Sequence, residues 1–139
     1  MQKYKIIIDT NLWISLLIGK RLSEMQSLCN DDSVVVYGCN QLRDEFLRVA
    51  HQNKIKKYVD GMRIEETLEL METSCEWVLP QKENVQSELR DVKDLYLLAL
   101  ADTIEADYLI TGDKDLLTLK AHNKTKILTY KEFETMMKS

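Results

Sequence analysis

Apolar and polar stretches alternate along the chain in two periods, one typical of strands and one typical of helices. Short apolar runs with few polar interruptions are typical of strands covered on both faces. They predict strands at 4–9, 34–37, 76–79, 108–111 and 127–128. Apolar residues at helical spacing predict helices that start near 11, 22, 40, 61, 95, 114 and 130. This alternation favours an α/β fold with a mostly parallel sheet.

Local signals set several of the boundaries. Gly19 separates the first two helical stretches, Asn40 is placed to cap the third, and Pro80 stops the strand before it. Thr129 and Glu132 have the spacing of a capping box for the last helix. The sequence has no repeat, low-complexity tract or linker, so its 139 residues predict one domain over 1–139.

Two carboxylates follow predicted strands. Asp9 closes the run Tyr4–Ile8, and Asp113 comes soon after the run 108–111. If both runs are parallel strands of one sheet, their carboxyl ends share the edge where open α/β sheets bind ligands. Acids gathered there repel one another unless a cation lies between them. Mg²⁺ and Mn²⁺ prefer oxygen ligands, so the pattern predicts a metal site.

Each acid also has an ordinary structural explanation. Asp9 can be a turn or capping residue, Asp94 can interact with a helix dipole, and Asp113 can belong to a surface turn. The metal hypothesis therefore rests on the acids taken together.

Composition changes this picture little. The apolar fraction is 45% and the charged fraction 30%, as in ordinary globular proteins. A net charge of −4 does not indicate a nucleic-acid binder, but an acidic metal site would account for much of it, and bound cations would reverse the local field. Cys29, Cys39 and Cys75 lack metal-binding or disulfide spacing and indicate a reducing compartment. With no signal-peptide pattern and no apolar stretch of membrane-spanning length, we expect a cytoplasmic protein without a membrane partner.

Four motifs together resemble a known family, the PIN domain, and most closely its branch of toxins from toxin–antitoxin pairs. The motifs are Asp9-Thr10-Asn11 after the first strand, Glu45 on an early helix, Arg90-Asp91-x-x-Asp94 opening a helix, and Thr111-Gly112-Asp113-Lys114-Asp115. The likeness covers nearly the whole chain. It is most specific over 91–117, whereas 50–80 matches only in its order of helices and strand.

The resemblance implies a three-layer α/β sandwich with a five-stranded, mostly parallel sheet in the order 3-2-1-4-5. Strands 1 and 4 are then neighbours at the point where the winding reverses, which agrees with the placement of Asp9 and Asp113 from the pattern alone. The resemblance also implies a Mg²⁺- or Mn²⁺-dependent ribonuclease, an RNA substrate, a cognate antitoxin and a homodimer.

Carried over by motif, the metal-binding and catalytic acids are Asp9, Asp94, Asp113 and Glu45. Two alternatives stay open: Asp44 in place of Glu45 as the inward-facing acid, and Asp115 as a second ligand or a surface residue. Asn11, Thr111 and Asp91 are candidate supporting residues that orient ligands or water.

The chemistry would be phosphodiester hydrolysis by metal-activated water. His51 and His122 lie in polar stretches where we expect surface positions, so the proton transfer falls to a carboxylate or to that water.

Two further features bear on partners. The basic residues Arg48, Lys54, Lys56 and Lys57 either grip an RNA backbone or form a solvated helix end. The first helix carries Trp13, Ile14, Leu17 and Ile18, more apolar residues than one core face needs, which favours a homodimer.

Two other classes of function compete. A haloacid-dehalogenase-type phosphatase also has an Asp after strand 1, but it needs a second acid two residues later, where this chain has Asn11. A catalytically silent RNA-binding module on the same fold would have lost one of the four acids, and here all are present.

Overall fold

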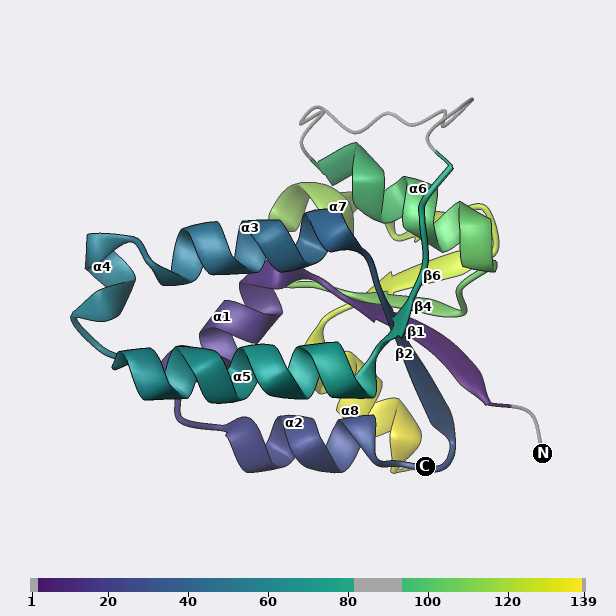
Figure 1. Cartoon of the computed structure of the whole chain (residues 1–139). Coiled ribbons are helices and arrows are strands. Elements are labelled where there is room, and N and C mark those ends of the chain that lie inside the picture. Colours follow the sequence, from purple (N-terminus) through teal and green to yellow (C-terminus); the bar gives the residue numbers. More distant parts are fainter. Residues whose placement is uncertain (1–2, 82–93, 139) are drawn as a thin grey trace.

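The computed structural model describes residues 3–81 and 94–138, which contain a central sheet flanked by helices (Figure 1). In these residues the sheet has six strands in the order β3-β2-β1-β4-β6-β5. The strands are β1 (Tyr4–Ile8), β2 (Val34–Gly38), β3 (Glu76–Trp77), β4 (Tyr108–Ile110), β5 (Ala121–His122) and β6 (Thr125–Leu128). All neighbours pair in parallel except β5 and β6, which are antiparallel. The predicted α/β class and mostly parallel order are confirmed, with β6 as the expected fifth strand.

Helices cover both faces of this sheet, as expected for the three-layer arrangement (Figure 1). α1, α2, α3 and α5 pack against one another on one side, with α8 beside α2, and α6 and α7 lie on the other. The helices are α1 (Thr10–Ile18), α2 (Leu22–Cys29), α3 (Asn40–Ala50), α4 (Asn53–Lys56), α5 (Gly61–Ser74), α6 (Leu95–Ile104), α7 (Lys114–Leu119) and α8 (Tyr130–Met137).

The middle of the sheet is apolar on both faces. Ile6, Ile7 and Ile8 of β1 are fully buried, as are Leu109 and Ile110 of β4 beside it. This is the burial that a parallel strand needs when helices cover both sides, and it explains the continuous apolar runs in the sequence.

Strand pairing continues one residue past β1 and β4. The Asp9 amide donates to the Ile110 carbonyl at 2.9 Å, and the Thr111 amide donates to the Leu128 carbonyl at 2.9 Å. The backbone ladder therefore places the first polar residues after these strands side by side at the carboxyl edge of the sheet.

Several predicted boundaries are corrected. β5 was not predicted, because it has only two residues and joins β6 through Asn123, whose φ of 52° closes a tight hairpin. The strand expected over 76–79 is limited to Glu76–Trp77. Asn40 is the first residue of α3 rather than its cap, which is Cys39. The capping box of Thr129 and Glu132 is confirmed.

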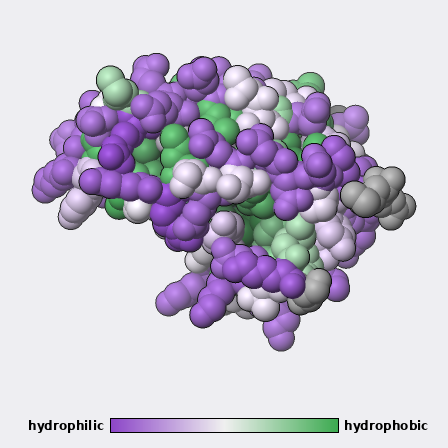
Figure 2. Space-filling model, turned by 90° about the horizontal axis from the view of Figure 1, so that it is seen from below, coloured by the Kyte–Doolittle hydropathy of each residue, from purple (hydrophilic) through white to green (hydrophobic). Residues whose placement is uncertain are grey.

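The apolar surplus assigned to the first helix is wrong. Trp13, Ile14 and Leu17 are at most 6% exposed, because α2, α3 and α5 pack around α1. They are core residues of this chain and give no argument for a dimer. On the face that carries α2 and α8, Figure 2 shows mainly hydrophilic side chains with hydrophobic ones recessed between them.

No helix in the described ranges is both long enough and apolar enough to cross a membrane.

Candidate functional site at the carboxyl edge of the sheet

Asp9 is the most deeply placed acid of the site. It occupies the N-cap position of α1, yet its side chain makes no capping hydrogen bond to that helix. Its Oδ2 instead accepts a hydrogen bond of 2.7 Å from the Thr111 hydroxyl, and the residue is only 3% exposed. Backbone N–H groups of Thr10 and Asn11 at the start of α1 also lower the pKa of Asp9, so the contact with Thr111 adds to a helix-start role and does not replace it.

Thr111 connects Asp9 to the next acid. Its hydroxyl oxygen also accepts the backbone N–H of Asp113 at 3.0 Å. Asp113 begins α7, where its Oδ1 accepts the N–H of Asp115 at 2.8 Å and that of Leu116 at 3.4 Å. Asp113 is thus a helix cap as well as a candidate ligand. Asp115 is exposed on α7.

Glu45, and not Asp44, is the acid of α3 that faces inward. Glu45 Oε2 accepts hydrogen bonds from the Tyr96 hydroxyl at 2.7 Å and from the Thr10 hydroxyl at 3.4 Å. The Asp44 side chain is 73% exposed and lies 3.5 Å from Arg43. Of these two acids, Glu45 is therefore the one that lies near Asp9, and its charge acts on the Asp9 carboxylate.

The electrostatics of this site are unfavourable without a cation. Burial raises the pKa of Asp9 above its ordinary value of 3.8, the Thr111 hydrogen bond opposes this, and the charge of Glu45 raises the pKa further. Within the described part of the chain, no lysine, arginine or histidine forms an ion pair with Asp9. Burial also raises the pKa of Tyr96, so its hydroxyl stays a neutral hydrogen-bond donor.

The start of α6 lies beside Glu45. Asp94 is the N-cap residue of α6 and is half-buried, and Tyr96 two residues later reaches Glu45. Asp91, proposed as a supporting residue, lies outside the described residues. Asn11 is exposed on the first turn of α1.

The donor chemistry of the site fits a hard divalent cation. Asp9 and Glu45 supply carboxylate oxygens, which Mg²⁺ and Mn²⁺ prefer. Among the described residues, however, no three His, Cys, Asp or Glu side chains converge closely enough to form an ion cage. Mg²⁺ is commonly held by one or two carboxylates together with waters and substrate phosphates, so such a cage is not required.

Sequence reasoning missed two residues of the site, Thr10 and Tyr96. Their hydroxyls lie 3.3 Å apart, and both hydrogen-bond to Glu45. Tyr96 could have been noticed as the one hydroxyl in the apolar run 95–101. Thr10 had no signal beyond its place next to Asp9.

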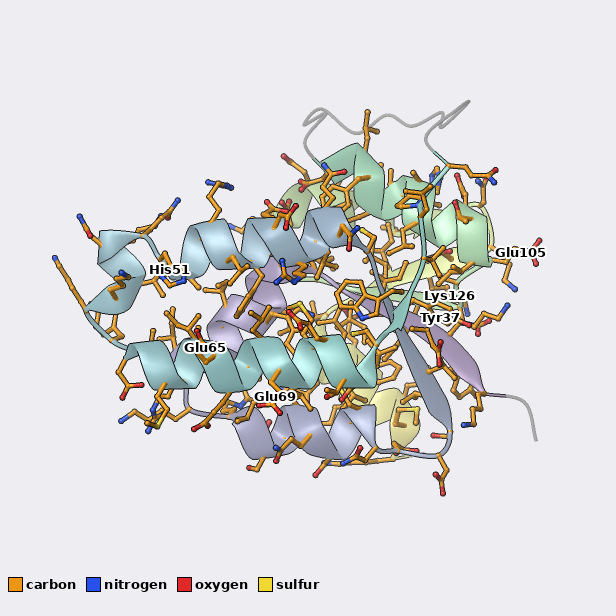
Figure 3. The ribbon with its side chains drawn as sticks, viewed as in Figure 1. Tyr37, His51, Glu65, Glu69, Glu105 and Lys126 are labelled. Atoms are coloured by element: carbon orange, nitrogen blue, oxygen red, sulfur yellow. The ribbon has the colours of Figure 1, made fainter. Side chains whose placement is uncertain are left out.

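Neither histidine is part of this site. His122 was expected at the surface, but it is only 8% exposed and its Nε2 lies 3.0 Å from Asp102 Oδ2. His122 can be buried because Asp102 of α6 lies next to β5 and provides its hydrogen-bond partner. His51 lies at the far end of α3, next to α4 (Figure 3).

The basic residues divide into two groups. Arg48 lies one turn after Glu45, and its Nη2 is 3.9 Å from Glu45 Oε1. Lys54, Lys56 and Lys57 are exposed in or next to α4, at the opposite end of α3 from the site (Figure 1). Arg48 therefore lies close to the acids, whereas the C-terminal part of α3 separates the three lysines from them.

Fold and site together define an α/β protein with a cluster of acidic side chains at the switch point of a parallel sheet. A family model for the PIN domain matches residues 5–115, and the chain belongs to the PIN-domain family. PIN domains are generally metal-dependent nucleases that use divalent ions, which implies a nucleic-acid substrate. No curated protein matches the chain.

Proposed function

We propose that the chain is a single Mg²⁺- or Mn²⁺-dependent endoribonuclease domain over 1–139. The observation that carries this proposal is the buried Asp9 carboxylate, which lies near Glu45 at the sheet edge and forms no ion pair with a cationic side chain of residues 3–81 and 94–138. Such a pair of carboxylates favours the binding of a divalent cation. The chain belongs to a family of nucleases, in which such a cation would serve catalysis.

The proposed cation ligands are Asp9, Glu45, Asp94 and Asp113. When bound, a divalent cation in such a site supplies acidification of water and neutralisation of phosphate charge. The hydroxyl of Thr111 holds Asp9 in position for this role. No histidine lies in the site, so a carboxylate of this set would accept the proton of the attacking water.

Other candidate residues would support these acids. We propose that Asn11, Asp91 and Asp115 orient water or ligands around them. Arg48, Lys54, Lys56 and Lys57 would contact RNA phosphates, with Arg48 nearest the acids.

The direct test is cleavage of a labelled single-stranded RNA with Mn²⁺, Mg²⁺ or EDTA. Wild type, Asp94→Asn and Asp32→Asn are compared at equal concentration. Asp32 is exposed in the turn before β2, so its variant has the same charge change away from the site. We expect metal-dependent cutting by wild type and Asp32→Asn, and a loss of at least about a hundredfold in Asp94→Asn, since changes even to residues behind a ligand cost about 10–100-fold.

Cutting that persists in EDTA would indicate a contaminating ribonuclease. Equal metal-dependent cutting by all three proteins would remove Asp94 from the mechanism. Absence of cutting, with no metal-dependent rise in the melting temperature of wild type, would instead favour a silent RNA-binding module. One observation favours this silent module: among the described residues, no three His, Cys, Asp or Glu side chains lie close enough together to hold a metal ion.

We further propose that this ribonuclease is the cytoplasmic toxin of a toxin–antitoxin pair, blocked by protein contact with its antitoxin, and that it acts as a homodimer. The PIN family and the resemblance of the motifs support the toxin role. Expression of wild type should arrest growth, and co-expression of a small neighbouring gene should relieve the arrest. Light scattering at micromolar concentration should give twice the mass of 16.3 kDa, and a monomeric mass would dismiss the dimer.

A further inference from the structure

A pocket opens directly beside the acidic side chains described above. It has a volume of about 420 Å³ and is lined by Gln41, Asp44, Glu45, Arg48 and Tyr96. This volume is within the range of pockets that hold small ligands. Glu45 belongs to both: its carboxylate lines the pocket and also accepts hydrogen bonds from Tyr96 and Thr10.

Helix α3 forms most of this pocket with one face. Gln41, Asp44, Glu45 and Arg48 are separated by three or four residues, so their side chains lie along the same side of the helix. α6 contributes Tyr96 opposite them. A ligand in the pocket would therefore meet an amide, a carboxylate and a guanidinium on α3.

These groups differ from what a metal or a bare anion would need. Arg48 is 64% exposed, and its Nη2 lies 3.9 Å from Glu45 Oε1, so a phosphate could approach it from solvent. The carboxylate of Asp44 is an acceptor only, and the amide of Gln41 can donate or accept. A pocket that binds a nucleotide needs a cationic group for the phosphate and hydrogen-bonding groups for the base. Arg48 can supply the first, and Gln41 and Asp44 can supply the second.

The carboxylate of Asp44 on α3 can discriminate among bases by the pattern of hydrogen-bond donors and acceptors that each base presents. A carboxylate has two acceptor oxygens, which pair best with two adjacent N–H donors. Guanine presents such a pair, N1–H and N2–H₂, on its Watson–Crick edge. The Watson–Crick edges of adenine, cytosine and uracil each place an acceptor next to a donor. A carboxylate repels that acceptor.

We infer that the pocket between α3 and α6 is a subsite for a guanine nucleotide adjoining the scissile phosphate, with Asp44 reading the base and Arg48 holding a phosphate. This inference rests on the proposed ribonuclease activity for its place in the reaction. The binding that it predicts does not depend on cleavage.

The test is binding of four labelled RNA heptamers in EDTA, which prevents metal-dependent cleavage. The heptamers are oligouridylates with G, A, C or U at the central position, and binding is followed by fluorescence anisotropy. Wild type should bind the G heptamer about tenfold more tightly than the U heptamer, since a bidentate base contact discriminates by roughly this factor or more.

Three variants separate the contributions. Asp44→Asn exchanges one acceptor for a donor at an exposed position and should bring the ratio of G to U affinities close to one. Arg48→Ala should weaken binding of all four heptamers by a similar factor while the ratio persists, because phosphate contacts carry no base information. Asp32→Asn, with the same charge change as Asp44→Asn, should keep the wild-type ratio.

Cleavage of the same heptamers in Mn²⁺ separates this inference from the proposed function. Metal-dependent cutting without a guanine preference in binding would overturn the subsite and leave the nuclease intact. A guanine preference that Asp44→Asn abolishes, without any cutting and without a metal-dependent rise in the melting temperature of wild type, would support the subsite and refute the ribonuclease. A preference unchanged in Asp44→Asn would remove Asp44 as the reader of the base and overturn the inference.

Discussion

Replacing Thr111 with valine separates the charge of Asp9 from the shape of the site. Valine has nearly the same shape as threonine but lacks its hydroxyl, and Thr111 is only 1% exposed, so the change acts mainly on buried hydrogen bonds. The change removes the 2.7 Å hydrogen bond to Asp9 and the acceptor of the Asp113 N–H. A hydrogen bond to a charged group contributes about 1.5–3 kcal/mol, and a neutral one about 1 kcal/mol.

A double-mutant cycle isolates the part that depends on charge. Thr111→Val should lower the free energy of unfolding by about 3 kcal/mol in the wild-type background, the sum of one charged and one neutral bond. In the Asp9→Asn background both bonds are neutral, so the same change should cost about 2 kcal/mol. The coupling between the two positions is therefore expected to be about 1 kcal/mol.

The sign of the pH dependence follows from the same contacts. Burial raises the pKa of Asp9 in the folded state above its ordinary value of 3.8, while the Thr111 bond alone acts to lower it. The charge-dependent part of the Thr111 contribution is thus present at neutral pH. It is lost as the pH falls through the folded-state pKa of Asp9.

Urea unfolding in EDTA, from neutral pH down through the acid range, measures both effects. Thr125→Val is the matched control, because the Thr125 hydroxyl is equally buried but donates to the neutral carbonyl of Ala106 at 2.7 Å. Its cost should be independent of pH and of the residue at position 9. A Thr111→Val cost that behaves in the same way would refute the claim that this hydroxyl stabilises an ionised Asp9.

Three other changes test the remaining contacts. Asp9→Asn should raise the free energy of unfolding at neutral pH in EDTA, because the raised pKa of Asp9 means that its ionised form disfavours the fold; a lower value by urea unfolding would contradict this. Tyr96→Phe, which removes the 2.7 Å bond to Glu45, should reduce kcat/KM for RNA cleavage about tenfold, and unchanged kinetics would show that the bond positions nothing. Substituting alanine for the three lysines within 54–57 should reduce the salt slope of RNA binding by up to about 2, and an unchanged slope would place the RNA elsewhere.

The fold could be predicted largely from the sequence because its central strands, β1 and β4, are largely buried on both faces. An apolar run as short and continuous as Ile6–Ile8 predicts a strand that is covered on both faces. β5 could not be predicted in this way, since Ala121–His122 is too short to show a period and depends on pairing with β6. Its existence is decided by tertiary contacts rather than by local pattern.

The choice between Asp44 and Glu45 was within reach of the sequence. Leu42 and Phe46 define the buried stripe of α3, and Glu45 lies three residues after Leu42, beside that stripe. Asp44, two residues after Leu42, lies about 200° around the helix from Leu42 and is thus farther from the buried stripe than Glu45. Helical geometry alone therefore favours Glu45 as the acid that reaches the sheet, as the structure shows.

The contacts of Thr10 and Tyr96 could not be derived in the same way. They hydrogen-bond to a glutamate 35 and 51 residues away in the sequence, so their role depends on how α1, α3 and α6 meet. A short-range pattern contains no information about such a meeting. The positions of acids at strand ends are predictable from topology, whereas the hydroxyls that orient them follow only from packing.

Hydroxyl groups balance the acids of the site only in part. Thr111 donates to Asp9, and Tyr96 and Thr10 donate to Glu45, but these neutral donors do not cancel the repulsion between the two carboxylates. No cationic side chain of the described residues pairs with Asp9, and Arg48 approaches Glu45 only to 3.9 Å from an exposed position. A proton on Asp9 could relieve the repulsion at low pH. At neutral pH the divalent cation proposed for this site would relieve it without a proton, so the neutral hydroxyls would preserve an arrangement that metal binding, and not folding, makes favourable.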